Sequence, residues 1–424
     1  MDVAPMMTRW SAQSTQQQQQ QQQQRPSWQQ RRSTLALLGS LLPSKSSVTK
    51  PVGHAKYAAG FFHKFRPPPW GGGNQFLLAL RQQLVDLDIA VFEAANFTFR
   101  PPASTKESYN LSPPRSNAKA TMDVVYLANA ITFDKKLRAE MLGSSASKLF
   151  KVIPPLVHRL DGPYYAARFE RDPRVEGSKP WRAKEDDDVY RINRKFACAT
   201  VYQSKWSMDM NKMLGYTPVE PVRIIPNAAD PSIFHSNGRT HWEDTPHMAA
   251  SSSSSSDTRV RVVTSAWSDG KRKGYDTLQW LDSNLDFTKY KLELYGRPSM
   301  GSRFKNVIVR KPVTSEELAV ELRESFDIFL TPSRLEPCSN SVVEALASGL
   351  PVVYQRGSGH DELVMNGGLG FDVKEELPDI LDRIVDSYTS FQGNISVTTI
   401  EKVAEAYSEV FGYCYREYLK RKPH

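Results

Sequence analysis

Two glutamates eight positions apart, Glu336 and Glu344, flank a junction that the sequence predicts to be strand, loop and helix. Residues 326–331 are a mostly apolar run with the length of a buried parallel strand. Residues that favour a helix start follow in the loop: Ser339, Asn340 and Ser341. Open α/β sheets bind ligands at the carboxyl ends of their strands, and the N–H groups of a helix start attract anions. The junction therefore predicts a site for an anionic ligand with hydroxyl groups, such as a nucleotide diphosphate joined to a sugar.

The two glutamates have different predicted roles and different alternatives. Glu344 lies in the apolar run 342–346, where a charge is costly to bury unless it is paired or binds a ligand. The alternative is a helix-start carboxylate that the helix dipole stabilises. Glu336 can reach a ligand from its loop, and its alternative is an ordinary solvated charge. Their placement, more than the interval between them, makes the pair a candidate site.

A basic cluster between another predicted strand and helix is a second candidate: Lys271, Arg272 and Lys273, followed by Gly274. A lysine in such a position can neutralise a leaving diphosphate as a compact point charge. The alternative is a basic turn on the surface. The cluster is therefore informative mainly in combination with the glutamates.

The first half of the chain contains two further candidates. One is a glycine run that precedes Asn74: Gly71, Gly72 and Gly73. Glycine lets a backbone approach a phosphate or sugar closely, and the alternative is a flexible turn. The other is the end of a predicted strand, where His158 or Asp161 is placed to contact a sugar hydroxyl. Its alternative is an ion pair of Asp161 with Arg159 or His158 that only shapes the loop.

Composition excludes several classes of protein. The 424 residues are 40% apolar and 10% aromatic, enough for two sizeable cores. The net charge is +9, of which residues 1–55 carry +5, so the remaining body is nearly neutral and nucleic-acid binding is disfavoured. Three cysteines lie far apart: Cys198, Cys338 and Cys414. We therefore expect no disulfide framework and no zinc site, and a reducing compartment fits best.

No run approaches the roughly 20 apolar residues of a membrane span, although peripheral contact with a membrane remains compatible with the sequence. The first 55 residues are basic and contain an unbroken glutamine tract from Gln16 to Gln24. A disordered leader on a cytoplasmic protein is the favoured interpretation. The alternative is an organelle transit peptide, because the leader is basic, poor in acids and contains serine.

Strands alternate with helices along the rest of the chain, which predicts an α/β fold with doubly wound parallel sheets. We predict a disordered leader over 1–55, a first domain over 56–220, a second domain over 221–400 and a C-terminal helix over 401–424. A polar insert over 236–257 is predicted to be disordered, and a hinge is expected near Asn227.

Over roughly 55–420 the chain resembles family 4 glycosyltransferases of the GT-B fold. The resemblance depends on the order of several elements: Pro69–Asn74, Pro226–Asp230, Arg272–Gly274, the Glu-x7-Glu pattern of Glu336 and Glu344, and Gly349–Val353. In that family an arginine commonly precedes the lysine by five or six residues, and here those positions are Ser268 and Trp267. The resemblance implies two Rossmann-like domains facing across a cleft, with the C-terminal helix returning to the first domain.

The resemblance also implies a reaction, in which a sugar moves from a UDP- or GDP-sugar to a glycan, lipid or small-molecule acceptor. The configuration is retained, and the reaction needs no metal or other cofactor. By this analogy Glu344 binds the ribose and Glu336 the transferred sugar, which His158 also touches. Lys273 and the amides of the helix start at 339–341 stabilise the departing diphosphate. The donor side includes Lys271, Arg272, Gly72 and Gly73, and the acceptor side includes Asp161 and Asn74. The alternative is a catalytically silent GT-B protein that binds a nucleotide or glycan.

Overall fold

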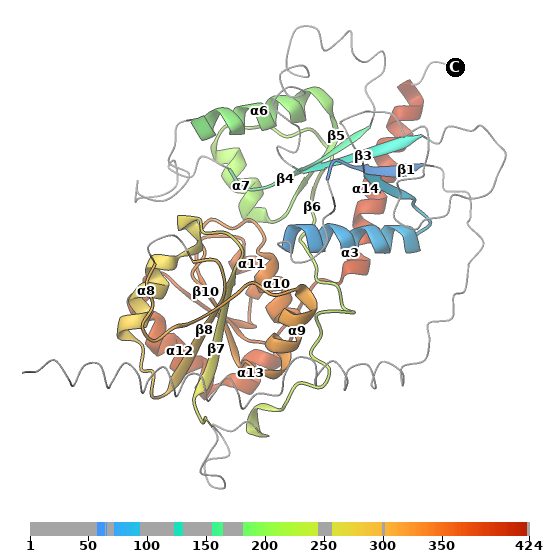
Figure 1. Ribbon diagram of the computed structural model, residues 1–424. Helices are drawn as coiled ribbons and strands as arrows, with labels where there is room; N and C mark the ends of the chain where they lie inside the picture. The colour runs from blue at the N-terminus through green and yellow to red at the C-terminus, as the bar shows by residue number, and fades with distance from the viewer. Residues whose placement is uncertain are drawn as a thin grey trace, which may run out of the picture. The chain divides into compact units, whose positions relative to one another are not determined.

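The computed structural model describes residues 57–63, 65, 72–93, 123–129, 155–163, 181–244, 257–298 and 302–421. Within these ranges the strands form two sheets of six strands each, and every pairing is parallel. Helices alternate with the strands (Figure 1). The predicted class, two Rossmann-like doubly wound domains, is confirmed. The predicted leader lies outside the described residues.

The first sheet has the strand order β2-β1-β3-β4-β5-β6. Its strands are β1 (Ala58–Phe61), β2 (Val91–Glu93), β3 (Val124–Asn129), β4 (Leu156–Leu160), β5 (Ala197–Tyr202) and β6 (Val222–Ile224). Its helices are α3 (Gly72–Asp86), α6 (Trp181–Phe196) and α7 (Lys205–Met213). The central strands β3 and β4 are buried along nearly their whole length, as expected where helices cover both faces of a parallel sheet.

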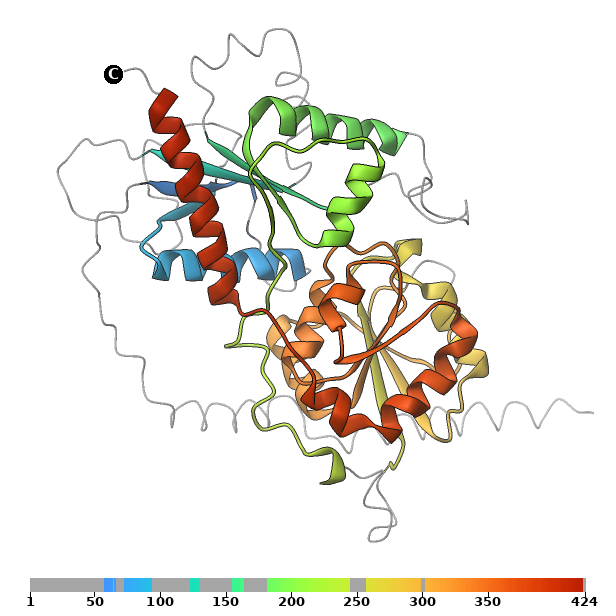
Figure 2. The same cartoon turned by 180° about the vertical axis from the view of Figure 1, so that it is seen from behind.

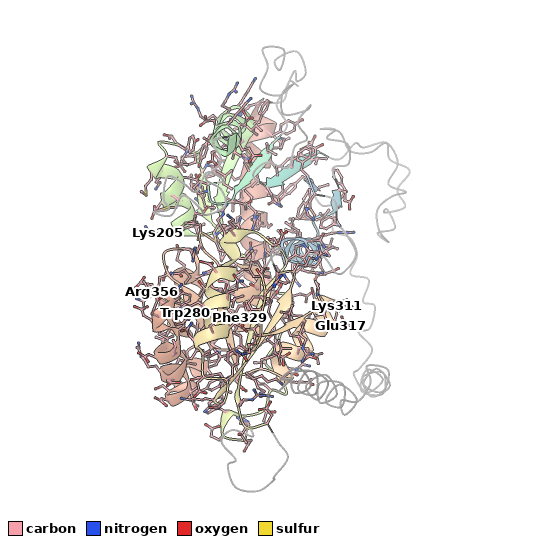
Figure 3. The ribbon with its side chains drawn as sticks, turned by 60° about the vertical axis from the view of Figure 1, so that its left-hand side comes forward. Lys205, Trp280, Lys311, Glu317, Phe329 and Arg356 are labelled. Carbon is pink, nitrogen blue, oxygen red and sulfur yellow. A yellow bond between two sulfur atoms is a disulfide. The ribbon has the colours of Figure 1, made fainter. Side chains whose placement is uncertain are left out.

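The second sheet has the order β12-β11-β10-β7-β8-β9. Its strands are β7 (Val260–Ala266), β8 (Tyr290–Gly296), β9 (Ile308–Arg310), β10 (Ile328–Thr331), β11 (Val352–Gln355) and β12 (Gly368–Phe371). Its helices are α8 (Tyr275–Asn284), α9 (Ser315–Glu324), α10 (Asn340–Ala347), α11 (His360–Val364), α12 (Leu377–Asp386) and α13 (Tyr388–Gly393). Phe329 on β10 is fully buried in this core, whereas Arg356 after β11 is exposed (Figure 3).

The C-terminal helix α14 (Ile400–Arg421) returns to the first sheet, as the resemblance implies. It lies beside α3 and against β3, β4 and β5 (Figure 2). Val403, Tyr407 and Phe411 enter the core of the first sheet from this helix. Their spacing of four residues places them on one helix face, which explains why the helix can bury its apolar side there.

Cys198 and Cys414 form a disulfide between β5 and α14. The expectation that the cysteines stay unpaired is therefore wrong. The two residues are 216 positions apart in sequence, and they meet only because α14 packs against β5. The argument for a reducing compartment, which depended on unpaired cysteines, no longer holds.

Two predicted boundaries also need correction. The strand β6 pairs with β5, so the first sheet extends beyond the predicted limit at residue 220. The extended chain of this strand completes one edge of the first sheet. The predicted disordered insert begins too early, because Arg239 donates to the carbonyl of Phe326 and Trp242 stacks on Tyr388 with ring centroids 3.8 Å apart. Among the described helices, none is both long and apolar enough to cross a membrane.

Candidate active site

A cavity of about 670 Å³ lies at the carboxyl ends of strands from both sheets. This volume is within the range of ligand sites. The first-sheet wall is formed by His63, Gly72, Gly73, Asn74, Asn129, Arg159, Asp161 and Gln203. The second-sheet wall is formed by Lys273, Glu336, Cys338, Ser339, Asn340, Ser341 and Glu344. The parallel strands place both walls where doubly wound sheets bind ligands.

Lys273 and Glu336 form an ion pair on the second-sheet wall. The Lys273 ammonium lies 2.6 Å from Glu336 Oε1, and the two side chains are 26% and 20% exposed. Burial by itself would raise the pKa of Glu336, but the positive charge of Lys273 outweighs burial and holds the pKa below its ordinary value. The pair therefore presents a cation and an anion next to each other at the cavity surface.

Glu344 has a different environment, although it lies on the same wall. It points from α10 into the cavity and is 9% exposed. Burial raises its pKa to about 8 because no cation among the described residues forms an ion pair with it. A buried carboxyl group without a charged partner is costly to the fold, so a ligand with hydroxyl donors is its natural complement.

The glycine run approaches this carboxyl group closely. A Cβ added to Gly72 would lie 2.3 Å from the Asn340 Cβ and 3.2 Å from Glu344 Oε1, so no larger residue fits there. Gly73 and Asn74 begin α3 beside it and also line the cavity. The structure therefore brings Gly72, Gly73, Asn74, Asn340 and Glu344 together at the cavity.

The start of α10 faces the same cavity. Ser339 precedes the helix with an extended backbone, and its side chain makes no capping hydrogen bond. Its hydroxyl instead lies 3.0 Å from that of Ser341. The first N–H groups of a helix have no intrahelical acceptor and carry the positive end of the helix dipole. An anionic group bound here would accept hydrogen bonds from the backbone and the hydroxyls.

The basic cluster contributes one residue to the cavity surface. Lys271 to Lys273 form a short 3-10 helix, and only Lys273 lines the cavity. Gly274 then turns the chain with φ 72°, where a Cβ would lie 2.3 Å from the Pro332 carbonyl oxygen. Arg272 acts at longer range, since its charge helps to lower the pKa of Glu336. The prediction that Lys271 and Arg272 contact a donor directly is therefore not supported by their position.

Trp267 and Ser268 also line the cavity. These are the positions at which the resemblance leads us to expect an arginine. The guanidinium carbon of Arg297, which follows β8, lies 4.4 Å from the centre of the Trp267 ring. The indole therefore has a cation against one face at this edge of the cavity.

His158 does not belong to the site, which corrects the sequence prediction. It is fully buried, it does not line the cavity, and its Nδ1 lies 3.4 Å from the Asn193 amide nitrogen. Side chains alternate along a strand, so the face of β4 that presents Arg159 and Asp161 to the cavity turns His158 toward α6. The alternative of an Arg159–Asp161 pair is the one that the structure contains, with a distance of 3.6 Å.

Arg159 is the centre of a hydrogen-bond network behind the first-sheet wall. It donates to Asn129 Oδ1 at 3.1 Å and to Asn227 Oδ1 at 2.5 Å. Asn227, at the predicted hinge, donates in turn to Asn340 Oδ1 at 3.0 Å. Asp161 accepts from Gln203, and desolvation raises its pKa although its side chain is 36% exposed. The network connects residues at or near the ends of four strands of the first sheet, and it also contacts α10.

A second support, which the sequence did not reveal, lies behind Glu336. The N–H of Gly359 donates to the Glu336 carbonyl at 2.8 Å. A Cβ on Gly359 would lie 2.0 Å from the Pro337 carbonyl oxygen, so glycine is required for this approach. The next residue, His360, is fully buried, and burial lowers its pKa. These contacts fix the backbone that carries Glu336.

Several cavity residues were not predicted: His63, Asn129, Gln203, Trp267 and Cys338. The first four end a strand or closely follow one, and a polar or aromatic residue at the end of a predicted strand was the available signal. No group of three or more His, Cys, Asp or Glu residues in the described part of the chain is arranged to hold a metal ion.

Residues 278–389 match the family model described as Glycosyl transferases group 1. This segment contains Glu336, Glu344 and the whole of α10. No curated protein matches the chain significantly in sequence. The matched segment covers about a quarter of the chain and includes the pair of glutamates on which the sequence prediction depends.

Solved structures resemble the chain over most of its length. Sucrose-phosphate synthase from Thermosynechococcus elongatus superposes with a TM-score of 0.57 at 14% identity, covering 86% of this chain and 100% of that one. HepE of Anabaena, in complex with UDP and glucose, gives 0.54 at 15% identity over 84% and 100% of the chains. WaaG, a glycosyltransferase involved in lipopolysaccharide biosynthesis, gives 0.50 at 13% identity over 85% and 98%. The fold is of the GT-B type, and with the family match it supports a glycosyltransferase.

Proposed function

We propose that the protein transfers a sugar from a nucleotide-sugar donor to an acceptor with retention of the anomeric configuration. The observation that carries the proposal is the second-sheet wall. It combines a buried carboxyl group without a cation, Glu344, with the Lys273–Glu336 pair and the start of α10. A nucleotide sugar offers a diol, a diphosphate and sugar hydroxyls in one molecule, and these match the three features.

In this proposal each residue of the wall binds one part of the donor. Glu344 accepts hydrogen bonds from the ribose hydroxyls, and Glu336 accepts them from the transferred sugar. Lys273 and the first amides of α10 bind the diphosphate. UDP is the favoured nucleotide, because the similar structure of HepE contains UDP and glucose. The acceptor enters along the first-sheet wall.

The proposed reaction forms one bond and breaks another. The oxygen of an acceptor hydroxyl bonds to the anomeric carbon on the face from which the diphosphate departs. The bond from this carbon to the diphosphate oxygen breaks, its electron pair leaves on the diphosphate, and a diphosphate oxygen takes up the hydroxyl proton. Lys273 and the α10 amides meet the negative charge that develops there, without a metal or another cofactor. Because the negative charge on the diphosphate grows as the bond breaks, these contacts are stronger in the transition state than in the ground state. They therefore lower the activation barrier.

A donor screen with the full-length protein tests the proposal. UDP, GDP, UDP-glucose, UDP-galactose, UDP-N-acetylglucosamine and GDP-mannose are compared for a rise in melting temperature and for slow hydrolysis. We expect one nucleotide family to bind and one of its sugars to be hydrolysed, and NMR of the released sugar then reports the configuration. A screen in which no compound binds contradicts the proposal. Binding of a nucleotide sugar without hydrolysis or transfer would favour the catalytically silent alternative.

The two glutamates provide the matched variants. We expect Glu344→Ala to weaken nucleotide binding, and Glu336→Ala to lower turnover while nucleotide binding is largely kept. Wild-type kinetics in both variants would contradict the assignment of the site.

A further inference from the structure

The start of α7, a helix of the first sheet, binds a carboxylate that comes from α11 of the second sheet (Figure 1). The backbone N–H of Lys205 donates to Glu362 Oε2 at 2.7 Å, and that of Trp206 donates to Oε1 at 2.6 Å. The third N–H of the helix, that of Ser207, is bound locally by Ser204 Oγ. A carboxylate is the natural partner for the two remaining N–H groups and for the positive end of the helix dipole. We call this pair of hydrogen bonds the Glu362 contact.

On its other side, α7 holds part of the first-sheet wall. Ser207 Oγ donates to the Asp161 carbonyl at 3.0 Å, and Asn211 Nδ2 donates to the same carbonyl at 3.2 Å. Asp161 lines the cavity. A shift of α7 would therefore move the backbone that carries this cavity residue.

The helix that carries Glu362 is joined in the same way to the second-sheet wall. Gly359 immediately precedes α11, and its N–H donates to the Glu336 carbonyl at 2.8 Å. Because α11 has only five residues, Glu362 lies three positions from this hydrogen bond. The Glu362 contact thus connects the support of Glu336 with the support of Asp161.

The segments that follow these two cavity residues also lie close together. A Cβ added to Gly162 would lie 3.0 Å from the Trp206 ring and 3.9 Å from the Pro337 Cβ. Burial is the main cause of the raised pKa of Asp161, and the negative charge of Glu336 raises it further. The two carboxylates therefore interact across the cavity, next to the Glu362 contact.

We propose that Glu362 is a positioning residue, which sets the distance between Glu336 and the Asp161 side of the cavity by binding the start of α7. The inference rests on the proposed function, in which Glu336 binds the transferred sugar. Glu362 does not line the cavity, so it acts through the two supports. A displacement of about 1 Å can lower the rate of an enzyme by about 10²-fold. The alternative is a helix cap that only stabilises α7.

The first residue of α7 offers a variant that removes one backbone donor. Proline is tolerated at the first position of a helix, where the N–H that it lacks has no intrahelical acceptor. Ser204 already has the extended backbone that a following proline requires, with φ −157° and ψ 161°. Lys205→Pro therefore deletes one half of the Glu362 contact and is compatible with α7. Lys205→Ala is the matched control, because it removes the side chain, which pairs with Asp209, and keeps the N–H.

The full-length proteins are assayed for hydrolysis of UDP-glucose, UDP-galactose, UDP-N-acetylglucosamine and GDP-mannose and for binding of UDP and GDP. Glu362→Ala should lower turnover by about 10–10²-fold. Lys205→Pro should lower it by about fivefold, the typical effect of one lost hydrogen bond. Because both changes break one contact, the double variant should stay within about twofold of Glu362→Ala. Nucleotide affinity should stay within about threefold of the wild type in every variant, since the proposed nucleotide contacts lie on the second-sheet wall.

The split between turnover and nucleotide affinity separates a positioning role from a stabilising one. Lost turnover with retained affinity in Glu362→Ala and Lys205→Pro, and wild-type turnover in Lys205→Ala, supports the inference. Wild-type turnover in Glu362→Ala, a parallel loss of turnover and nucleotide affinity, or losses that multiply in the double variant overturn it. If the wild type hydrolyses none of the four compounds, the proposed function fails and the inference fails with it. An active wild type with equally active Glu362→Ala overturns the inference alone.

Discussion

The two walls of the cavity contain similar polar and charged side chains, but these side chains have different hydrogen-bond and ion-pair partners. On the first-sheet wall, Arg159 is bonded to two asparagines and lies beside Asp161. On the second-sheet wall, Glu344 has no ion pair with a cation among the described residues, and Lys273 and Glu336 are paired with each other. The polar side chains of the first-sheet wall are thus hydrogen-bonded to one another. The charged side chains of the second-sheet wall remain available to a ligand in the cavity.

This difference indicates how each wall contributes to the protein. A polar group with partners inside the protein stabilises the fold, and its loss leaves those partners unsatisfied. A polar group without partners destabilises the fold and is available to a ligand. We therefore expect substitutions in the first-sheet network to reduce stability, and substitutions in the second-sheet wall to reduce activity. The following predictions test this contrast.

The largest effect is expected for Lys273→Ala. Removal of one group that stabilises a developing negative charge typically lowers turnover by about 10²–10³-fold. The side chain is 26% exposed, so the free energy of unfolding should change by less than about 1 kcal/mol. Steady-state hydrolysis of the donor found in the screen, together with urea unfolding, measures both quantities. Turnover within threefold of the wild type would show that the charge of Lys273 is not used.

The converse result is expected for Arg159→Met, which keeps the bulk of the side chain. It leaves Asn129, Asn227 and Asp161 without their shared donor, and loss of one partner in a buried ionic network costs about 3 kcal/mol of unfolding free energy. The affinity of the folded fraction for nucleotide should be nearly unchanged. Urea unfolding and nucleotide titration are the measurements. If the variant is as stable as the wild type but no longer binds nucleotide, the expectation that the first-sheet network contributes mainly to stability is wrong.

A smaller effect, with opposite signs for stability and binding, is expected for Glu344→Gln. The pKa of Glu344 is about 8 in the folded protein and 4.5 ordinarily, so the folded state retains a proton that the unfolded chain has lost. Wild-type stability therefore falls as the pH rises from 4.5 through 8. Glutamine carries no charge, so the variant should gain little at pH 5 and about 0.5–2 kcal/mol above pH 8.

Nucleotide affinity of the same variant should fall by about tenfold, which corresponds to about 1.4 kcal/mol, because the amide accepts fewer hydrogen bonds from a diol. Thermal unfolding across pH and nucleotide titration at pH 8 are the two measurements. A variant that is less stable than the wild type above pH 8 would show that Glu344 has a stabilising partner.

The smallest effect is expected for Lys271→Ala, the matched control for Lys273→Ala. Lys271 is exposed and does not line the cavity, so turnover and stability should stay within about twofold and about 0.5 kcal/mol of the wild type. The same hydrolysis and unfolding assays apply. A loss as large as that of Lys273→Ala would mean that the whole cluster acts on the donor.

The second-sheet wall was largely predictable from sequence, and the first-sheet wall was not. The strand, loop and helix around Glu336 and Glu344 are contiguous, so helix-start residues and an apolar run were enough to place them. His158 was chosen over Arg159 because β4 is buried along its whole length and shows no polar alternation to identify its cavity face. His63, Asn129 and Gln203 were missed because they meet only through the strand order.

The disulfide and the boundary of the first domain at residue 220 were mispredicted for a related reason. Cys198 and Cys414 have no informative spacing, and they are brought together by the return of α14 to the first sheet. The pairing of β6 with β5 is a tertiary contact that local composition does not encode.

The sequence by itself determined the alternation of strands and helices, the glycine run, the lysine of the basic cluster and the pair of glutamates. These features are local, since propensity, capping and hydrophobic period act over a few residues. Only the tertiary structure decided which face of β4 meets the cavity, which cysteines pair, and that His63 and Asn74 lie opposite α10. Those outcomes depend on strand order and side-chain direction, which are set by the packing of segments far apart in the chain.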